Sequence, residues 1–268
     1  MSTSIHPSAV VDPEALLGTD VSIGPYAIIE KNVRIGDATV IDSFGQVKEY
    51  TSLGRNNHIH SHACIGGTPQ ELKFQGEKTR LEIGDDNCFR EFVTVHRGTH
   101  EGGGVTRVGS GCLIMAYAHI AHDCQLGDGV IMANAATLAG HVIVDKWAVI
   151  GGLCAIHQFV HIGEFAYIGG MTGVSQDVPP YMLVAGERGR LNNLNIVGLR
   201  RRGVNKETVA ALKTAFKLIW RSGLKRQEAL EKVRMELGDC FEVQQLVEFV
   251  AASQRGVVAP KDKSASPS

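Results

Sequence analysis

An aliphatic residue returns at every sixth position along the first two thirds of the chain. A helix repeats its apolar face every three to four residues and an amphipathic strand every two, so neither produces this spacing. Short strands separated by tight corners, with one bulky inward residue each, do produce it, and this is the hexapeptide repeat of a parallel β-helix. Three hexads make one triangular coil, so residues 18 apart should lie one above another at strand spacing, roughly 4.8 Å. The inward positions run from Ile5 to Ile65, from Ile83 to Val95 and from Val108 to Val174.

The repeat is interrupted twice, at residues 66–80 and 97–107. Both segments are polar and rich in glycine, so we expect them to project as loops from corners of the coil. Binding groups are commonly placed on such loops.

The pattern becomes helical near the C-terminus, where Val209, Leu212, Phe216 and Ile219 share one face. Asn205 is a suitable N-cap for this helix. Further helices are expected at about 226–237 and 243–252. We therefore expect a mainly β protein with three parts. These are a β-helix over 1–190, a helical domain over 191–256 and a disordered tail over 257–268.

Composition narrows the function classes. The 27 basic and 28 acidic residues balance, which gives no reason to expect binding to nucleic acid or insertion into a membrane. The six cysteines show no C-x-x-C spacing and are expected to be small buried residues. The N-terminus lacks the basic start and apolar run of a signal peptide. These features predict a cytoplasmic protein.

The segment 118–124 (AHIAHDC) places histidines and an aspartate inside the most regular part of the repeat. The 18-residue offset puts His122, Gly140 and Gln158 in one column on successive coils. A histidine base beside an accessible backbone N–H suits acyl transfer to a hydroxyl, because the base takes the proton and the N–H stabilises the oxyanion. No serine or cysteine nucleophile elbow is present, so direct attack by the acceptor is favoured. The predicted patch comprises His119, His122, Gly140, His141, His157 and Gln158.

Zinc binding is the alternative for so many histidines. His58, His60 and His62 are spaced like ligands, and some hexapeptide-repeat proteins are zinc-dependent carbonic anhydrases. Those proteins hold zinc with histidines two coils apart, whereas Gln158 stands two coils after His122. We therefore expect no metal, and we interpret the three histidines as structural or surface residues with His60 on the opposite side from the others. Arg200, Arg201 and Arg202 form either a solvated turn or a phosphate site.

Five segments carry a closer resemblance: 118–124, 136–141 (ATLAGH), 155–159 (AIHQF), 176–181 (QDVPPY) and 195–203 (NIVGLRRRG). They resemble the UDP-N-acetylglucosamine 3-O-acyltransferase family of lipid A biosynthesis, and the similarity covers nearly the whole chain. The resemblance implies a left-handed β-helix and a homotrimer with active sites between subunits. It also implies UDP-N-acetylglucosamine as acceptor, acyl carrier protein bearing a (3R)-3-hydroxyacyl chain as donor, and no cofactor.

The same resemblance assigns roles to residues. His122 would be the general base on the glucosamine 3-hydroxyl, Asp123 its orienting partner and Gly140 the oxyanion donor. Gly170 falls where the family sets acyl length, and a glycine there implies a longer chain. Arg201 and Arg202 would contact phosphates. Contacts to sugar, diphosphate or acyl donor would come from Gln70, Glu71, Lys73, His96, His119, His141, His157, Gln158 and Asn195.

Two positions depart from the family pattern. Glu71 stands where an aspartate is common, and Val197 stands where a glutamate is common beside the nucleotide. The second change removes a polar contact. The alternatives to the leading hypothesis are N-acylation of the 3-amino analogue of the sugar nucleotide, a zinc lyase and a non-catalytic scaffold.

Overall fold

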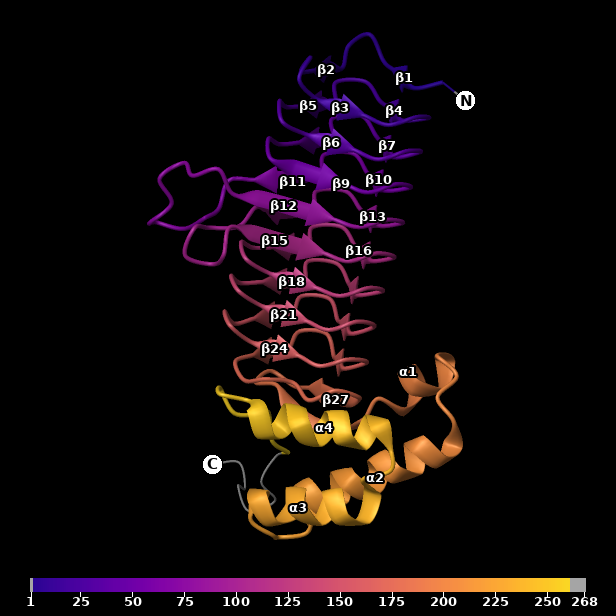
Figure 1. Cartoon of the computed structure of the whole chain (residues 1–268), viewed down its shortest axis with the longest axis vertical. Coiled ribbons are helices and arrows are strands. Elements are labelled where there is room, and N and C mark those ends of the chain that lie inside the picture. The colour runs from indigo at the N-terminus through magenta and orange to yellow at the C-terminus, as the bar shows by residue number, and fades with distance from the viewer. Residues whose placement is uncertain (1, 261–268) are drawn as a thin grey trace.

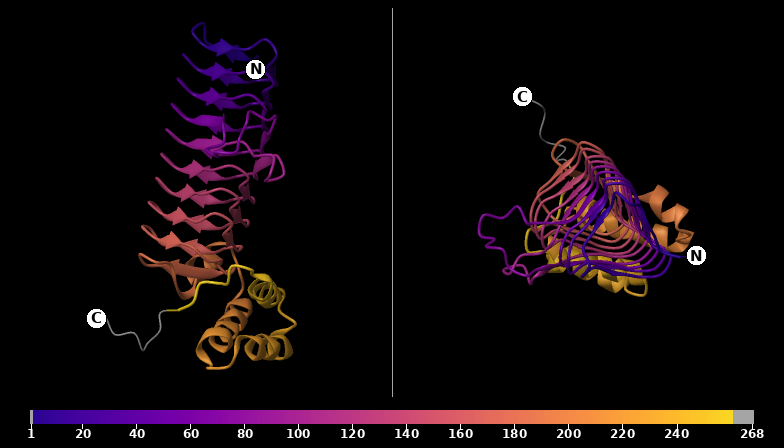
Figure 2. Two further views of the ribbon diagram at one scale, coloured as in Figure 1. Left: turned by 90° about the vertical axis from the view of Figure 1, so that its left-hand side faces the viewer. Right: turned by 90° about the horizontal axis from the view of Figure 1, so that it is seen from above.

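The computed structural model describes residues 2–260 of the 268-residue chain, and the first two thirds form a left-handed parallel β-helix. Figure 1 shows the coils stacked along the long axis, with the helices gathered at the C-terminal end. The view from above in Figure 2 shows a triangular cross-section. We call the sheets that form its three faces A, B and C.

Each regular coil gives one strand to each sheet, and sheet A has an antiparallel strand, β28 (Arg190–Leu194), added at its C-terminal end. Sheet A contains β1 (Ser4–Ile5), β4 (Ser22–Ile23), β7 (Val40–Ile41), β10 (His58–Ile59), β13 (Cys88–Phe89), β16 (Leu113–Ile114), β19 (Ile131–Met132), β22 (Val149–Ile150), β25 (Tyr167–Ile168), β27 (Met182–Ala185) and β28 (Arg190–Leu194). Sheet B contains β2 (Val10–Val11), β5 (Ile28–Ile29), β8 (Gln46–Val47), β11 (Cys64–Gly67), β14 (Thr94–His96), β17 (His119–Ile120), β20 (Thr137–Leu138), β23 (Ala155–Ile156) and β26 (Gly173–Val174). Sheet C contains β3 (Leu16–Leu17), β6 (Arg34–Ile35), β9 (Thr51–Leu53), β12 (Arg80–Ile83), β15 (Val105–Val108), β18 (Gln125–Leu126), β21 (Ile143–Val144) and β24 (His161–Ile162).

The six-residue repeat explains the core. The last residue of a typical strand points inward, and Ile59, Phe89 and Ile120 at such positions are completely buried. Successive side chains of a strand alternate between faces, so the residue before each of them points outward. One fully buried aliphatic or aromatic side chain contributes about 1.5–3 kcal/mol, and this contribution recurs on the faces of the coils that follow the first, whose Ile5 is 46% exposed.

The register shows where the two loops enter. Ile23 pairs with Ile41, the regular offset of 18, whereas Ile65 pairs with Val95 and Val95 with Ile120. These offsets of 30 and 25 correspond to insertions of 12 and 7 residues. The strands on either side of the insertions leave loops at 68–79 and 97–104, shorter than the interrupted segments of the sequence.

Most corners turn through one residue in the left-handed region, and the non-glycine residues there have φ between 54° and 69°. Two corners concern the rest of the molecule. At the A–B corner, rings stack from coil to coil with centroids 4.9–5.1 Å apart, and His62 lies between Phe44 and Phe92. At the B–C corner stand Asp123, His141 and both loops.

Within residues 2–260, four helices close the C-terminal end of the β-helix: α1 (Ile196–Arg201), α2 (Lys206–Arg221), α3 (Arg226–Leu237) and α4 (Phe241–Ala252). Asn205 caps α2 through its side chain, which accepts from the backbone N–H of Thr208 at 2.7 Å. α4 returns to the β-helix, where Phe249 packs on His161. The sequence did not predict α1, because its six residues are too few to show a helical period.

The domain limits also differ from expectation. β28 continues sheet A to Leu194, because it pairs antiparallel with β27, so the helical part begins at 196 and not at 191. The prediction of a tail from 257 is wrong for its described part. Val257 and Val258 are buried, and Val257 bridges to Asp177. Residues 261–268 lie outside the described residues.

All six cysteines are free, and three of them, Cys112, Cys124 and Cys154, are buried. Within residues 2–260 no helix combines the length and the apolar character needed to cross a bilayer.

Candidate active site

The B–C corner concentrates polar groups in the middle of the β-helix. Loops 68–79 and 97–104 leave this corner on adjacent coils and project together from the molecule, as Figure 1 shows. Lys73 and Glu101 link the loops through an ion pair of 3.2 Å between Nζ and Oε2. The two side chains are about two-thirds exposed, so this pair contributes little to stability. The coils carrying His122 and His141 follow directly after the second loop.

His122 and Asp123 form a buried pair at this corner. The Nδ1 atom of His122 lies 2.8 Å from Oδ2 of Asp123, and their side chains are 10% and 1% exposed. An ionised carboxylate only accepts hydrogen bonds, so Nδ1 of His122 donates to it, and in the neutral ring Nε2 is the nitrogen that carries the lone pair. Nε2 is therefore the position from which this ring can act as a base.

Loop 97–104 fixes the carboxylate of Asp123. Thr99 donates its backbone N–H to Oδ1 at 2.8 Å and its hydroxyl to Oδ2 at 2.7 Å, while the N–H of Asp123 donates to the hydroxyl of Thr106 at 2.7 Å. Gly102 lies so close that a Cβ there would meet the carboxylate carbon at 2.0 Å. Burial by itself would raise the pKa of Asp123, but the hydrogen bonds from His122 and Thr99 outweigh it and lower that pKa. The carboxylate therefore stays ionised.

The sequence did not reveal Thr99 and Thr106. The six-residue repeat places residues only inside the coil, and Thr99 belongs to an insertion that has no register. The only available signal was its position in a glycine-rich interruption.

Gly140 lies beneath the ring of His122, as the 18-residue offset predicts. The N–H of His141 donates to the carbonyl of His122, and the N–H of Phe159 donates to the carbonyl of Gly140, so these corners stack coil on coil. A Cβ on Gly140 would stand 2.5 Å from Cε1 and 2.8 Å from Nε2 of His122. Among residues 2–260, no group accepts a hydrogen bond from the N–H of Gly140. A basic nitrogen and a free backbone donor thus lie side by side.

His141 completes the corner. Its ring stands edge-on to His122 with centroids 5.2 Å apart and stacks on Phe159 at 4.5 Å. Burial lowers the pKa of His141, against the opposing effect of the Asp123 charge. A cavity of about 400 Å³ opens between this ring and the loops. It is lined by Glu71, Lys73, Phe74, Gln75, Glu77, Thr99, His100, Glu101 and His141.

His96 and His119 lie on the sheet B side of this corner. Their rings meet edge-on at 4.9 Å, and Nδ1 of His119 is 2.7 Å from the hydroxyl of Thr94. Burial lowers the pKa of His119, and burial together with the neighbouring His119 lowers the pKa of His96 to about 4. In the described part of the chain, Nδ1 of His96 is buried without a hydrogen-bond partner. Both rings are therefore neutral near pH 7 and suited to uncharged polar groups.

The remaining predicted residues of this region are exposed. Gln70 lies on the first loop, and His157 and Gln158 lie one coil below Gly140. The sequence did not reveal Arg255, whose Nη2 donates to the carbonyl of Ser175 at 3.1 Å and lies 3.3 Å from Nδ1 of His157.

One chain does not bring all predicted residues together. Arg202 lies over the ring of Trp147, 3.7 Å from its centroid, at the corner between sheets C and A. Asn195 caps α1, because its Oδ1 accepts from Gly198 N at 2.9 Å and its Nδ2 donates to the carbonyl of Phe165 at 3.0 Å. Arg201 lines the same cavity of about 540 Å³ as Arg202, Asn195 and the exposed Val197. Gly170 stands at the third corner, between sheets A and B. The predicted residues are therefore divided among all three corners of the triangle seen in Figure 2.

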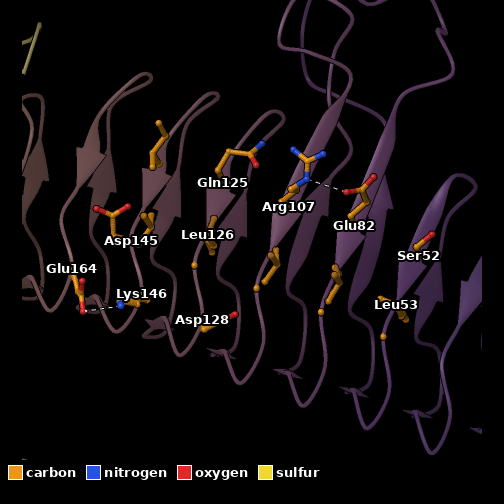
Figure 3. Close-up of a pocket in the computed structure, with 18 of the residues that line it drawn as sticks. Ser52, Leu53, Glu82, Arg107, Gln125, Leu126, Asp128, Asp145, Lys146 and Glu164 are labelled. Carbon is orange, nitrogen blue, oxygen red and sulfur yellow. Dashed lines mark hydrogen bonds and ion pairs between the residues drawn. The ribbon is translucent and has the colours of Figure 1, made fainter. Parts of the chain in front are cut away.

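A broad hollow of about 1080 Å³ lies elsewhere, over the outer face of sheet C (Figure 3). Its charged side chains are largely paired with one another: Arg107 Nε is 3.0 Å from Glu82 Oε2, and Lys146 Nζ is 3.4 Å from Glu164 Oε1. Among the described residues that line it, none is a histidine. The chemistry therefore belongs to the B–C corner, although the cavity there is smaller.

Comparison with known proteins agrees with the geometry. The sequence matches the family described as bacterial transferase hexapeptide (six repeats) at residues 105–140 and domain 2 of UDP-N-acetylglucosamine O-acyltransferase at residues 177–258. It is 49% identical over 255 residues to the acyl-[acyl-carrier-protein]–UDP-N-acetylglucosamine O-acyltransferase of Syntrophobacter fumaroxidans, covering 95% of this chain and 99% of the relative. The solved UDP-N-acetylglucosamine O-acyltransferase of Moraxella catarrhalis has a TM-score of 0.92 at 41% identity, covering 95% of this chain and 99% of that one. The solved UDP-N-acetylglucosamine acyltransferase of Francisella novicida has a TM-score of 0.93 at 34% identity, covering 96% and 95%.

Proposed function

Since this chain belongs to the family of acyl-[acyl-carrier-protein]–UDP-N-acetylglucosamine O-acyltransferases, we propose that it acylates the glucosamine 3-hydroxyl of UDP-N-acetylglucosamine. The donor is a (3R)-3-hydroxyacyl thioester of acyl carrier protein, and the reaction is the first step of lipid A biosynthesis. One observation carries the mechanism: His122 is oriented by Asp123 at 2.8 Å, with its free Nε2 beside Gly140.

The transfer needs no covalent enzyme intermediate. Nε2 of His122 takes the proton of the sugar hydroxyl while the hydroxyl oxygen forms a bond to the thioester carbonyl carbon. The N–H of Gly140 stabilises the resulting oxyanion. When the intermediate collapses, the carbon–sulfur bond breaks, and the thiol of the carrier receives the proton from the His122 imidazolium. Asp123, held ionised by Thr99, stabilises that imidazolium in both halves of the reaction.

The surroundings suit the two substrates. Neutral His96 and His119 offer hydrogen bonds to sugar hydroxyls and to the N-acetyl group, and Glu71 and Lys73 line the cavity above the base. The acyl chain runs across sheet B from the B–C corner toward Gly170 at the A–B corner. The outward positions there, at the starts of β20, β23 and β26, are small residues.

A homotrimer explains the division of residues among corners. Arg201 and Arg202 bind phosphate groups, yet they lie at the C–A corner while His122 lies at the B–C corner. When three triangular prisms pack side by side, one corner of a chain meets a different corner of its neighbour. This packing brings the phosphate-binding arginines of one subunit next to the catalytic base of the next.

Complementation tests this assembly. His122→Ala and Arg202→Ala are each inactive by themselves in this arrangement. Co-expression of the two chains should restore activity, because some mixed interfaces then combine an intact base with an intact arginine. Mixtures that stay inactive while native mass spectrometry shows mixed trimers would place both residues in a site within one chain.

A mass-spectrometric transfer assay without added metal tests the reaction itself. Incubation with UDP-N-acetylglucosamine and 3-hydroxyacyl carrier proteins of graded length should give a product with one acyl chain, and His122→Ala should abolish it. Product from the 3-amino analogue alone would replace O-acylation by N-acylation. Metal-dependent bicarbonate formation without acyl transfer would indicate a lyase.

The cytoplasm is the compartment that we propose for the reaction. The six free cysteines agree with a reducing environment. Acyl carrier protein and nucleotide sugars meet the enzyme there.

A further inference from the structure

A second cluster of histidines lies on the outer face of sheet A, far along the surface from the B–C corner. Asp42 follows β7, and His58 and His60 begin and follow β10 on the next coil. The prediction that His60 lies on the opposite side from His58 is wrong. Strand side chains two residues apart share a face, so Ile59 points into the core and both histidines point out. The proposed acyl transfer uses none of these residues.

The two imidazoles converge on one oxygen atom. Nε2 of His58 lies 3.0 Å and Nδ1 of His60 lies 3.3 Å from the same Oδ2 of Asp42. The rings stack with centroids 3.9 Å apart and an interplanar angle of 23°. Two ring nitrogens from stacked rings therefore face a single carboxylate oxygen.

These separations match a metal coordination sphere. Zinc binds histidine nitrogen at about 2.0–2.1 Å and carboxylate oxygen at about 2.0–2.2 Å, so neighbouring ligands of a tetrahedral ion are roughly 3.3 Å apart. The three donor atoms of Asp42, His58 and His60 all lie within 4.8 Å of one another. Only small rotations of the side chains are needed to direct them at one ion.

The surroundings support such an ion. Cys88 Sγ lies 3.5 Å from Nε2 of His60, the nitrogen left free when Nδ1 binds a metal, and partners of this kind fix the orientation of a ligating ring. Glu91 Oε1 lies 3.9 Å from Nδ1 of His60 and offers a fourth ligand, which water replaces while Arg90 holds Glu91. In the single chain the side chains of Asp42, His58 and His60 are 32%, 41% and 20% exposed.

We propose that Asp42, His58 and His60 form a binding site for a divalent transition-metal ion, with zinc the ion that best matches the donor set. The ion connects two successive coils, since Asp42 and the histidines belong to different turns of the β-helix. Its role is structural and independent of the proposed acyl transfer.

Zinc titration of the full-length, chelator-stripped protein tests the proposal. We expect one zinc ion per chain by calorimetry, and a rise of the unfolding temperature with zinc concentration, because the ion binds only the folded chain. His58→Gln and Asp42→Asn should each weaken binding at least tenfold and remove the thermal shift. His62→Phe is the matched control. It removes a neighbouring imidazole but keeps a ring in the stack between Phe44 and Phe92, so zinc binding should persist.

The second potential donor group in residues 2–260, His122 with Asp123 and His141, is the main competitor for the ion. His141→Gln should leave stoichiometry and affinity unchanged. Zinc binding that survives in His58→Gln and disappears in His141→Gln would overturn the proposal, as would a wild-type affinity no better than that of Asp42→Asn. Circular dichroism of each variant without zinc checks that the β-helix is intact, and acyl transfer by His58→Gln should equal wild type with or without zinc.

Discussion

Gly140→Ala tests the geometry of the active site without removing any hydrogen-bonding group. The backbone at Gly140 lies outside the left-handed region, so alanine is compatible with its conformation. The new Cβ would stand 2.5 Å from Cε1 of His122, whereas ordinary contact begins at 3.4 Å. The ring must therefore retreat by about 0.9 Å, the difference between these two distances. This movement also stretches the hydrogen bond to Asp123.

A displacement of roughly 1 Å in a reacting group costs on the order of 10²-fold in rate. We therefore expect kcat of Gly140→Ala to fall by about two orders of magnitude. Overpacking of this kind typically destabilises a protein by about 1–3 kcal/mol. The transfer assay at saturating substrates gives the first quantity, and urea unfolding gives the second.

A double-mutant cycle identifies the origin of the stability cost. In the His122→Ala background the ring is absent, so Gly140→Ala should be nearly neutral, and the coupling free energy should be about 1–3 kcal/mol. A kcat within threefold of wild type would refute the close approach of ring and glycine. An equal stability cost in both backgrounds would show that the strain arises elsewhere.

Three further predictions concern the neighbours of this pair. Thr99→Val keeps the backbone N–H bond to Asp123 but removes the hydroxyl donor, and a hydrogen bond to a charged group is worth about 1.5–3 kcal/mol. We therefore expect kcat to fall about tenfold and the acidic limb of the pH–rate profile to move to higher pH. An unchanged profile would contradict this role of Thr99. The pKa of His96 is about 4 in the folded protein and 6.5 ordinarily, so the unfolded state binds more protons between these values. Stability should therefore decrease by up to about 3 kcal/mol as pH falls from 6.5 to 4, and urea unfolding of His96→Gln should show a weaker pH dependence than wild type. Gly170→Met fills the A–B corner beside Gly152. The transfer assay with donors of graded acyl-chain length should therefore show a shift to shorter chains. An unchanged preference would show that Gly170 does not line the path of the acyl chain.

The sequence predicted the parts of the fold that a period can determine. The aliphatic residue in every hexad identified the inward side chains of nearly all coils, and the 18-residue offset by itself placed His122 above Gly140. Such an inference works because each residue of a solenoid contacts mainly its neighbours one coil away. Which corner residues stack on one another then follows directly from their separation in the sequence.

Residues outside the periodic register escaped prediction. Thr99 reaches Asp123 from an insertion, and Arg255 reaches His157 after the last helix, 98 residues along the chain. Neither pairing follows from counting hexads. The misplacement of His60 has another cause, because the alternation of strand side chains was available in the sequence and puts His58 and His60 on one face.

The position of Arg202 shows what a single chain cannot provide. A triangular prism exposes its corners separately, so residues at different corners cannot reach one substrate, however well each is placed. His122 and Asp123 pair at the B–C corner, and Arg202 packs over Trp147 at the C–A corner. Sheet C lies between these two corners. A nucleotide sugar needs contacts to its phosphates and to its reacting hydroxyl at the same time. These separated corners are the reason for the homotrimer that we propose, and the complementation of His122→Ala by Arg202→Ala tests whether a second subunit completes the site.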